Sequence, residues 1–338
     1  MCKILLEVFY TLNSKIGEVM KKTLLSLAVV GALSVSANAF TLGNLGDFTF
    51  KKFADNLYIL PGPPMEPNEE NEGFMNNPAI IESEHGLIMI DPGGNYNVGK
   101  KILAEVEKVS KKPIIAIIDT HKHGDHWFAN KTMAEKYPDV KIYALQHMID
   151  VSKAGEAEKW YGILERLSKN LKGTKEFQFP TIALKNGDKL EIDGQTFIMH
   201  HPTKAHTDTD LVILHVNSKT LFLGDNLMKS RLGGFDGSSS ILGNIKLLED
   251  VEKAPELNLY VPGHGAPGKM HETLDPFIKY MKLLEVGAKE ALDEDMEAYE
   301  IKPKVIESMK DFQKWDAFEG QMGKHLQKMV EEVEALDE

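Results

Sequence analysis

Cysteine is almost absent from this sequence of 338 residues, and the only thiol belongs to Cys2. Residues 1–19 precede Met20, which we expect to be the true start, so the mature protein would contain no cysteine. A chain without thiols forms no disulfide and offers no thiolate as a nucleophile or as a metal ligand. Cysteine catalysis is therefore excluded.

The apolar segment 24–35 is too short to be a good transmembrane helix. It follows the basic pair at residues 21–22 and precedes the small residues of Ala37-Asn38-Ala39. This order is typical of a secretory signal. We expect cleavage after Ala39, a periplasmic or secreted mature protein, and no stable membrane anchor after processing.

Positive charge is scarce, because 39 Lys and Arg residues stand against 51 Asp and Glu residues, a formal net charge of −12. Removal of residues 1–39, which hold four lysines and two glutamates, makes the net charge −14. Such a surface repels phosphate backbones, so we expect no nucleic acid among the partners. A small anionic substrate is still compatible with this charge, because the local field at a metal site is positive.

The hydrophobic fraction is 42% and the charged fraction 27%, which provides enough apolar sequence for one large core. The expected strands lie within 40–60 and 79–90 and at 114–118, 140–145, 177–182, 189–192, 196–200, 211–216, 220–223 and 259–261. The expected helices lie at 98–109, 127–137, 154–171 and 241–251. The early strand-helix-strand order indicates an α/β fold, and the later strands indicate a second β-layer.

Residues 61–77 interrupt the first strands with prolines, glycines and glutamates, a composition typical of an exposed loop. Two interpretations are open: the segment is a disordered surface insertion, or it is a flap over the active site that carries Met65 or Phe74. From His271 onward the chain is helical and amphipathic. This pattern predicts packing on the rest of the protein or on a partner subunit, so a homo-oligomer through these helices is one expectation.

The chemistry is concentrated in residues 113–130, where the apolar run 114–118 ends in a polar turn. The turn contains three histidines and an aspartate: His121, His123, Asp125 and His126. In a partly buried site these groups would repel one another without compensation, whereas a divalent cation uses all of them as ligands. The first two imidazoles face one side of an extended turn, and Asp125 with His126 can face a neighbouring ion. One loop could therefore serve two metals.

Four more polar residues lie at or near the ends of predicted strands: Asp91, His206, Asp225 and His264. Together with the histidine cluster they resemble the five signature motifs of the metallo-β-lactamase superfamily, over residues 77–265. The resemblance implies an α/β fold of the αββα four-layer sandwich type, with the metals along one edge of the two sheets. We expect three parts of the chain: a signal region at 1–39, a catalytic domain at 40–270 and a helical C-terminal extension at 271–338.

The same resemblance implies a dinuclear site for two Zn²⁺ ions, although iron or another divalent metal could take their place. The first ion would be held by His121, His123 and His206. The second would be held by Asp125, His126 and His264, with Asp225 bridging the two. Asp91 would support the metal loop by holding backbone or imidazole N–H groups. Each site keeps an open position, which is typical of catalytic coordination.

Two cations held ~3.5–4 Å apart lower the pKa of a bridging water to about 7, so the expected nucleophile is hydroxide. Asp125 would orient that hydroxide and later return the proton to the leaving group. The expected substrate is a small molecule with an electrophilic carbonyl, such as an ester, lactone, thioester or β-lactam amide. Lys229 and Arg231 follow Asp225 and could attract a substrate carboxylate, although loop charges are more often plain surface charges.

Asp225 departs from the better-known β-lactamases, which carry a cysteine or serine near this position. A bridging aspartate is typical of the wider hydrolase superfamily, so β-lactam hydrolysis is not the default expectation. The signal region, the Gly224-Asp225-Asn226 segment and the long C-terminal helices are similar to periplasmic metallohydrolases associated with bacterial sulfur oxidation and quinoprotein systems. Two alternatives remain open, namely a mononuclear iron sulfur or persulfide dioxygenase and a non-enzymatic periplasmic zinc-binding protein.

The remaining histidines match no motif position. His200 and His201 are expected to be loop residues, and His215 a hydrogen-bonded residue of the core. Four others are expected in turns or on the surface: His85, His147, His271 and His325.

Overall fold

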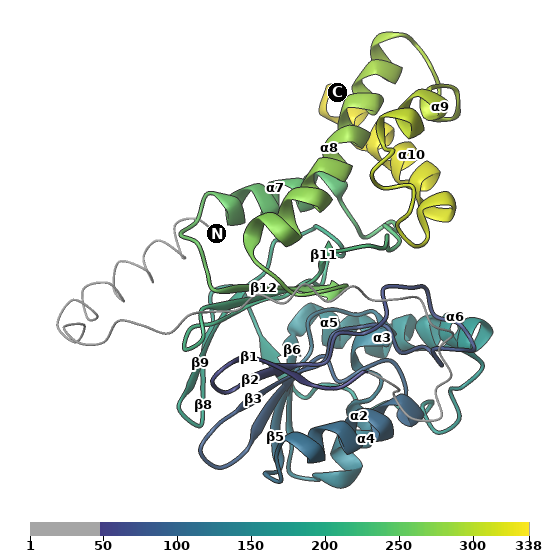
Figure 1. Ribbon diagram of the computed structural model, residues 1–338. Helices are drawn as coiled ribbons and strands as arrows, with labels where there is room; N and C mark the ends of the chain where they lie inside the picture. Colours follow the sequence, from purple (N-terminus) through teal and green to yellow (C-terminus); the bar gives the residue numbers. More distant parts are fainter. Residues whose placement is uncertain (1–47, 338) are drawn as a thin grey trace, which may run out of the picture.

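Residues 48–337 are described by the computed structural model, and within this range the chain forms two stacked β-sheets with helices on their outer faces (Figure 1). The predicted signal region lies outside the described residues. The first sheet is paired in chain order: β1 (Lys51–Ala54), β2 (Leu57–Ile59), β3 (Ala79–Glu82), β4 (Leu87–Ile90), β5 (Ile114–Ile118), β6 (Lys141–Leu145) and β7 (Ile182–Leu184). The second sheet has the order β12-β11-β10-β9-β8: β8 (Lys189–Ile192), β9 (Gln195–His200), β10 (Val212–His215), β11 (Thr220–Met228) and β12 (Leu259–His264).

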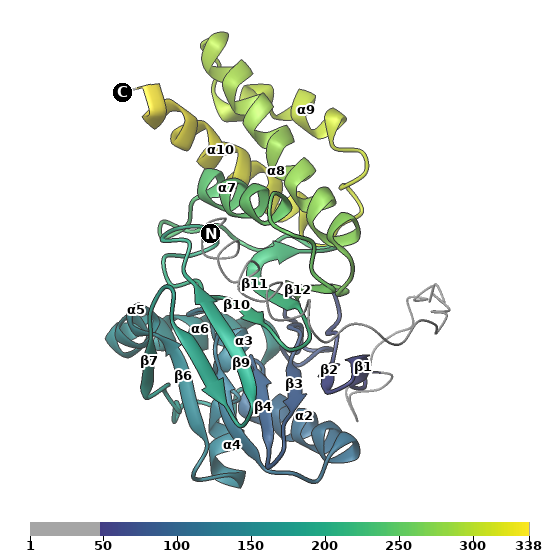
Figure 2. The same ribbon diagram turned by 90° about the vertical axis from the view of Figure 1, so that its left-hand side faces the viewer.

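The helices fall into two groups along the chain. The first group lies between β4 and β7 in the sequence, and the second group lies after β11. The first group is α2 (Tyr96–Val109), α3 (Gly124–Trp127), α4 (Asn130–Lys136), α5 (Gln146–Val151), the π-helical turn η1 (Ser152–Glu156) and α6 (Ala157–Ser168). The second group is α7 (Ile241–Glu252), α8 (Met270–Asp293), α9 (Ala298–Ser308) and α10 (Phe318–Asp337). In Figures 1 and 2 the second group lies together on the outer side of β11 and β12.

Three apolar cores separate four layers, because adjacent residues of a strand point to opposite faces of its sheet. Ile117 lies in the core between the first sheet and α2, whereas its neighbour Ile118 lies in the core between the two sheets. In the second sheet, Ile213 faces the first sheet, and Leu214 faces the core that contains α7 to α10. The predicted αββα sandwich with a C-terminal helical region is confirmed.

Parallel pairing in both sheets gathers the polar segments at one edge. β4, β5 and β6 are parallel neighbours in the first sheet, and β11 is parallel to β12 in the second. The carboxyl ends of parallel neighbours meet at the same edge of a sheet, and ligands bind in open α/β sheets at that edge. The segments after β4 and β5 and the ends of β11 and β12 therefore lie close together.

Two predicted helices differ from the structure. The predicted helix 127–137 is split into α3 and α4, because Gly93 hydrogen-bonds the chain on both sides of the break. Its N–H donates to His126 O at 2.9 Å, and its carbonyl accepts from Ala129 N at 2.8 Å. The predicted helix 154–171 is a longer irregular run, α5-η1-α6, that bends at Gly155, where φ is +118°.

Two predicted strands also differ. The segment 177–182 pairs only from Ile182 onward, because Phe177 and Phe179 pack against the ring of Trp127, with centroid distances of 6.1 and 5.6 Å. The strand predicted at 220–223 continues to Met228 as β11. It continues because it pairs in parallel with β12 as far as the Met228–His264 pair.

Residues 61–77 form an ordered loop, so the interpretation as a disordered insertion is wrong. The Asn71 side chain accepts hydrogen bonds from Asn68 N and Gly73 N, both at 2.9 Å. Phe74 is buried in the core outside the first sheet, so it does not cover the edge where the polar segments meet. The loop reaches that edge through Met75, whose carbonyl accepts a hydrogen bond from His264. Among residues 48–337 we find no helix that is long and apolar enough to cross a membrane.

Candidate metal centre

The turn after β5 brings its four predicted ligands together. The His121 ring lies 4.7 Å from the His123 ring and 4.4 Å from the His126 ring, measured between centroids. Helix α3 begins at Gly124, so Asp125 and His126 stand on its first turn. All four side chains are buried. A local motif thus places four metal-ligand types in one buried volume.

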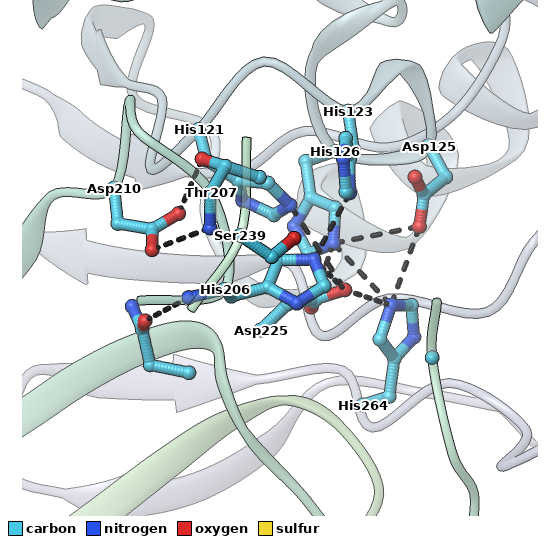
Figure 3. A network of polar contacts seen from close by, with 12 residues as sticks. His121, His123, Asp125, His126, His206, Thr207, Asp210, Asp225, Ser239 and His264 are labelled. Carbon is cyan, nitrogen blue, oxygen red and sulfur yellow. Dashed lines mark hydrogen bonds and ion pairs between the residues drawn. The ribbon is translucent and has the colours of Figure 1, made fainter. Parts of the chain in front are cut away.

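The second sheet brings the other three predicted ligands to the same place, as Figure 3 shows. His206 lies in the loop between β9 and β10, Asp225 lies within β11, and His264 is the last residue of β12. Asp225 Oδ2 lies 3.6 Å from His206 Nε2 and 3.2 Å from His264 Nε2. The structure therefore brings together all seven residues that the sequence singled out.

The seven side chains form two sets that share Asp225. Within each set, one nitrogen or oxygen atom per residue lies within 4.8 Å of the others. The first cluster is His121, His123, His206 and Asp225. The second cluster is Asp125, His126, His264 and Asp225. Imidazole nitrogens and carboxylate oxygens at this spacing could hold a divalent metal ion in each cluster.

Two glycines shape the backbone around the shared carboxylate, and one of them makes room for it. Gly224 adopts φ of +53°, in a part of β11 where the register with β12 shifts. A Cβ atom on Gly263 would lie only 1.9 Å from Asp225 Oδ1 and 2.8 Å from the carbonyl carbon of Gly224. Only glycine therefore fits at position 263 while Asp225 points into the centre.

Asp91 supports the turn after β5 through hydrogen bonds to Thr120 and a contact with His126. Its Oδ1 accepts a hydrogen bond from Thr120 N at 2.8 Å, and its Oδ2 accepts one from Thr120 Oγ1 at 2.7 Å. Oδ2 also lies 2.8 Å from His126 Nδ1. The carboxylate therefore holds both a backbone N–H group and a ligand imidazole, the two kinds of contact expected from the sequence. Such contacts fix the tautomer and the orientation of a metal-binding histidine.

Other ligands have supports of different kinds. His264 Nδ1 donates to the Met75 carbonyl at 2.9 Å, which turns Nε2 toward the second cluster. His121 Nδ1 lies 3.0 Å from Thr120 Oγ1. The His123 ring packs on Trp160 at a centroid distance of 4.3 Å. Among these supporting residues, only Thr120 could have been suspected from the sequence, because it directly precedes His121.

The electrostatics of the centre favour a cation. Burial and the nearby His126 keep the pKa of His121 well below its ordinary value. Burial opposes ionisation of Asp125, but His126 and His264 outweigh this effect and lower the pKa of its carboxyl to about 2. Burial likewise opposes protonation of His126, but Asp225, Asp125 and Asp91 raise the pKa of its imidazole well above the ordinary value. The ionised carboxylates thus attract positive charge between them.

The donor set fits divalent metal ions. His121 Nε2 is buried and has no hydrogen-bond partner in the described part of the chain, although it points toward Asp225 Oδ2 at 3.9 Å. Two pairs of imidazole nitrogens face each other across the clusters, His123 Nδ1 with His206 Nε2 at 3.1 Å and His126 Nε2 with His264 Nε2 at 3.3 Å. A divalent cation could replace the shared proton between the two nitrogens of each pair.

Arg231, one of the two cations after Asp225, does not meet the expectation for a substrate contact in an exposed loop. Arg231 is buried, and its Nη1 donates to the Met65 carbonyl at 3.1 Å and lies 3.3 Å from His264 Nδ1. That ring nitrogen is on the side of His264 that faces away from Asp225. Arg231 therefore lies behind a ligand, held by the loop 61–77, and not in an exposed loop. Lys229 is half-buried.

The other histidines lie outside the two clusters. His201 Nδ1 contacts the Asp210 carbonyl at 2.8 Å, and His215 is buried between Ser218 and Gln195, as expected for a core residue. His85, His147 and His271 are exposed, as expected. The expectation for His325 is wrong, because its side chain is buried: its ring nitrogens contact Tyr280 Oη at 2.8 Å and the Gly233 carbonyl at 2.9 Å.

Comparison with protein families matches residues 71–298 to the metallo-beta-lactamase superfamily. The chain is 26% identical over 207 residues to the metallo-beta-lactamase type 2 of Bacillus cereus, a match that covers 58% of this chain and 70% of that protein. It is 25% identical over 205 residues to the hydroxyacylglutathione hydrolase of Francisella philomiragia, covering 61% and 68%. A segment of 75 residues is 40% identical to the linear primary-alkylsulfatase of a Pseudomonas species, covering 21% of this chain and 14% of that enzyme.

Solved structures share the fold. The metallo-beta-lactamase from Pontibacter korlensis superimposes with a TM-score of 0.54 at 14% identity, covering 70% of this chain and 99% of that protein. A double mutant of the sec-alkyl sulfatase PisA1 superimposes with a TM-score of 0.63 at 14% identity, covering 85% of this chain and 50% of the sulfatase. A match over 85% of the 338 residues includes more residues than the range 1–270 contains. The likeness in fold therefore extends into the C-terminal helices.

Proposed function

Because the chain belongs to the metallo-β-lactamase superfamily, whose relatives named above are hydrolases, we propose that it is a dinuclear zinc hydrolase of small molecules. One observation carries the proposal: two clusters of buried histidines and aspartates share the carboxylate of Asp225. In this reading the first cluster holds one ion and the second cluster holds the other. A purely structural protein would have no need of two such adjacent sites.

The chain's own residues supply positioning and proton transfer. Two bound divalent ions would lower the pKa of a water molecule between them and polarise the bond to be cleaved. Asp125 Oδ2 lies 3.3 Å from His264 Nε2 and 3.4 Å from His126 Nε2, so the carboxylate points into the second cluster. The carboxylate could accept a hydrogen bond from the attacking water. It would then pass the proton to the leaving group.

The proposed substrate has an electrophilic carbonyl, as in a small ester, lactone, thioester or β-lactam amide. Two curated relatives support this class by name, since one is a β-lactamase and the other a hydroxyacylglutathione hydrolase. A second candidate is a sulfate ester. It is favoured by the segment of 75 residues that is 40% identical to an alkylsulfatase, the highest identity among the relatives described above.

The test is a substrate panel with zinc-loaded protein, containing a chromogenic β-lactam, a lactone, a thioester, a carboxylic ester and an alkyl sulfate. We expect turnover of at least one member, abolished by a chelator and restored by zinc, at the same rate without oxygen. Turnover of only the alkyl sulfate would select the second candidate. Iron-dependent oxygen uptake with a persulfide and no hydrolysis would overturn the proposal in favour of a dioxygenase. No turnover of any kind would favour a zinc-binding protein.

We also propose that the mature protein is periplasmic or secreted. The basic residues 21–22, the apolar segment 24–35 and Ala37-Asn38-Ala39 support this location. Mass spectrometry of the protein from its native compartment should find Phe40 as the first residue. A soluble cytoplasmic species that retains Met20 would contradict the location.

A further inference from the structure

We propose that His325, on the last helix of the C-terminal region, is a positioning residue for the first metal cluster: it fixes Phe235 against the ligand His206. The inference rests on the proposed function, because it concerns how one of the two metal sites is held in shape. It assigns a role to helices that follow the predicted catalytic domain.

The ligand imidazoles are not supported in the same way. In three of them the ring nitrogen that faces away from the clusters contacts an oxygen atom: His121 with Thr120, His126 with Asp91, and His264 with Met75. His206 is different. Its Nδ1 atom is buried and has no hydrogen-bond partner among the residues that the structure describes. The orientation of the His206 ring must therefore come from packing.

Phe235 provides that packing from outside the centre. Its ring lies 5.7 Å from the His206 ring at an interplanar angle of 65°, an edge-to-face arrangement. Gly233 lies on the same side, since a Cβ atom there would be 3.8 Å from His206 Cε1. Both residues belong to the segment 230–240, which has no strand or helix of its own beyond a single bridge at Arg231. Hydrogen bonds within residues 236–239 shape the far part of the segment, whereas Gly233 and Phe235 contact neighbouring elements.

His325 contacts this segment at Gly233 and Phe235, which lie beside the His206 ring. Its Nε2 donates to the Gly233 carbonyl at 2.9 Å, and its ring lies 5.0 Å from Phe235 in an edge-to-face contact. Its Nδ1 accepts from the Tyr280 hydroxyl at 2.8 Å, and Tyr280 is itself fully buried on α8. Both ring nitrogens are therefore engaged, and the imidazole has one orientation. A continuous contact path runs from α8 through His325 and Phe235 to His206.

The C-terminal region also fixes both ends of the segment. Near its start, Leu232 N donates to the Asp316 carbonyl at 3.0 Å, and Asp316 N donates to the Ser230 carbonyl at 3.0 Å. At its end, the Glu332 carboxylate accepts from Ser240 Oγ at 3.0 Å and from the first backbone N–H groups of α7. Between these ends, His325 holds the part of the segment beside His206, whereas Asp236 and Ser238 are held further along by Lys159 and Lys122.

The arrangement predicts a selective effect on the two metal sites. His126 and His264 are supported by Asp91 and Met75, which belong to the first sheet and its loops. Arg231 of the segment also lies beside His264, but it is held by the Met65 carbonyl and by a bridge to Asp316, not by His325. The His206 ring, in contrast, packs on Phe235 of the segment that His325 contacts. Loss of His325 should therefore loosen the first cluster and leave the second cluster intact. Partners in the outer shell of a metal site are typically worth ~10–100-fold in metal affinity.

The experiment measures zinc affinity by competition with a chromophoric chelator, one cluster at a time. His264→Ala leaves the first cluster complete, and His121→Ala leaves the second complete. Into each background we introduce His325→Leu, which removes both hydrogen bonds, and separately Phe235→Leu, which removes the aromatic ring and keeps His325 with its two hydrogen-bond partners. His271→Leu is the matched control, because His271 is an exposed histidine on α8.

We expect His325→Leu and Phe235→Leu to weaken zinc binding ~10–100-fold in the first-cluster background and less than about threefold in the second. His271→Leu should change neither. Equal losses in both backgrounds, or no loss from Phe235→Leu in a folded protein, would overturn the inference and leave the proposed function standing. Failure of the two parent variants to bind any zinc would remove the proposed function and this inference with it.

Discussion

At the junction of the two clusters, Asp225 Oδ1 lies 3.1 Å from His126 Nε2, and Oδ2 lies 3.6 Å from His206 Nε2. A carboxylate can offer one oxygen to each of two cations, whereas a thiol or hydroxyl group has a single ligand atom. Burial opposes ionisation of Asp225, but His264 and His126 outweigh it and keep the pKa of this carboxyl well below its ordinary value. The residue is therefore charged and suited to bridge.

The variant Asp125→Asn tests whether another carboxylate of the centre, that of Asp125, acts as a proton acceptor. Asparagine has nearly the same shape but carries no negative charge, so it weakens one ligand of the second cluster and removes the proton acceptor. General acid–base catalysis alone is worth roughly 10²–10⁴-fold, and we expect a loss of kcat/KM of at least that order. Asp311→Asn, an exposed aspartate on the C-terminal region, is the control and should retain full activity. A thermal melt should show both variants folded. Activity of Asp125→Asn within a few fold of wild type would contradict this role.

At the scale of single residues, the local motif made most of the site predictable. One turn contains His121, His123, Asp125 and His126, so their residue types and spacing alone indicate metal binding. The position of Phe235 and the burial of His325 could not be predicted in this way. Helical periodicity shows that His325 belongs to an amphipathic helix, but it does not show that the Gly233 carbonyl meets it there.

Among the elements, β11 and β12 determine where the shared carboxylate points. The sequence predicted β11 only to Leu223, because Gly224-Asp225-Asn226 is typical of a turn. The strand continues to Met228 because β12 pairs with it in parallel, and a contact between such distant segments leaves no local pattern. Irregular register at Gly224 then points Asp225 inward, a feature that strand periodicity does not predict.

Gly263→Ala tests this strand geometry. The added Cβ would lie 1.9 Å from Asp225 Oδ1 and 2.8 Å from the Gly224 carbonyl carbon, so either the carboxylate or the strand pair must move. We expect weaker metal binding at both clusters, since both use Asp225, together with a lower melting temperature. The measurement is zinc affinity by chelator competition. Gly162→Ala, where an added Cβ meets nothing within 4 Å, should bind metal like wild type. Unchanged affinity in Gly263→Ala would contradict the assigned position of Asp225.

Across the whole molecule, the C-terminal helices are part of the main core. Leu214, Leu221 and Leu223 of the second sheet share one apolar core with Leu284, Leu326 and further residues of α8 and α10. Figure 2 shows these helices stacked on β11 and β12. The amphipathic pattern after residue 271 predicted packing on the sandwich or on a partner subunit, and the structure shows packing on the sandwich. The helices form the fourth layer together with α7.

Truncation at residue 269 tests how far the catalytic domain depends on this layer. Chains 40–269 and 40–338 would be produced side by side, both lacking the predicted signal region. We expect the shorter chain to be insoluble or to melt without cooperativity, because the outer face of the second sheet would expose a large apolar surface. A shorter chain that melts cooperatively and binds zinc like the longer one would contradict this expectation.

The central claim is a pair of metal sites joined by Asp225, and the most direct test is the zinc content of fully loaded, desalted protein. Elemental analysis per chain should give about two equivalents for wild type and about one each for His121→Ala and His264→Ala, because each removes a ligand from a different cluster. Asp225→Ala should bind both ions less tightly, since it removes a ligand from each cluster. A single equivalent in wild type that Asp225→Ala leaves unchanged would contradict the account.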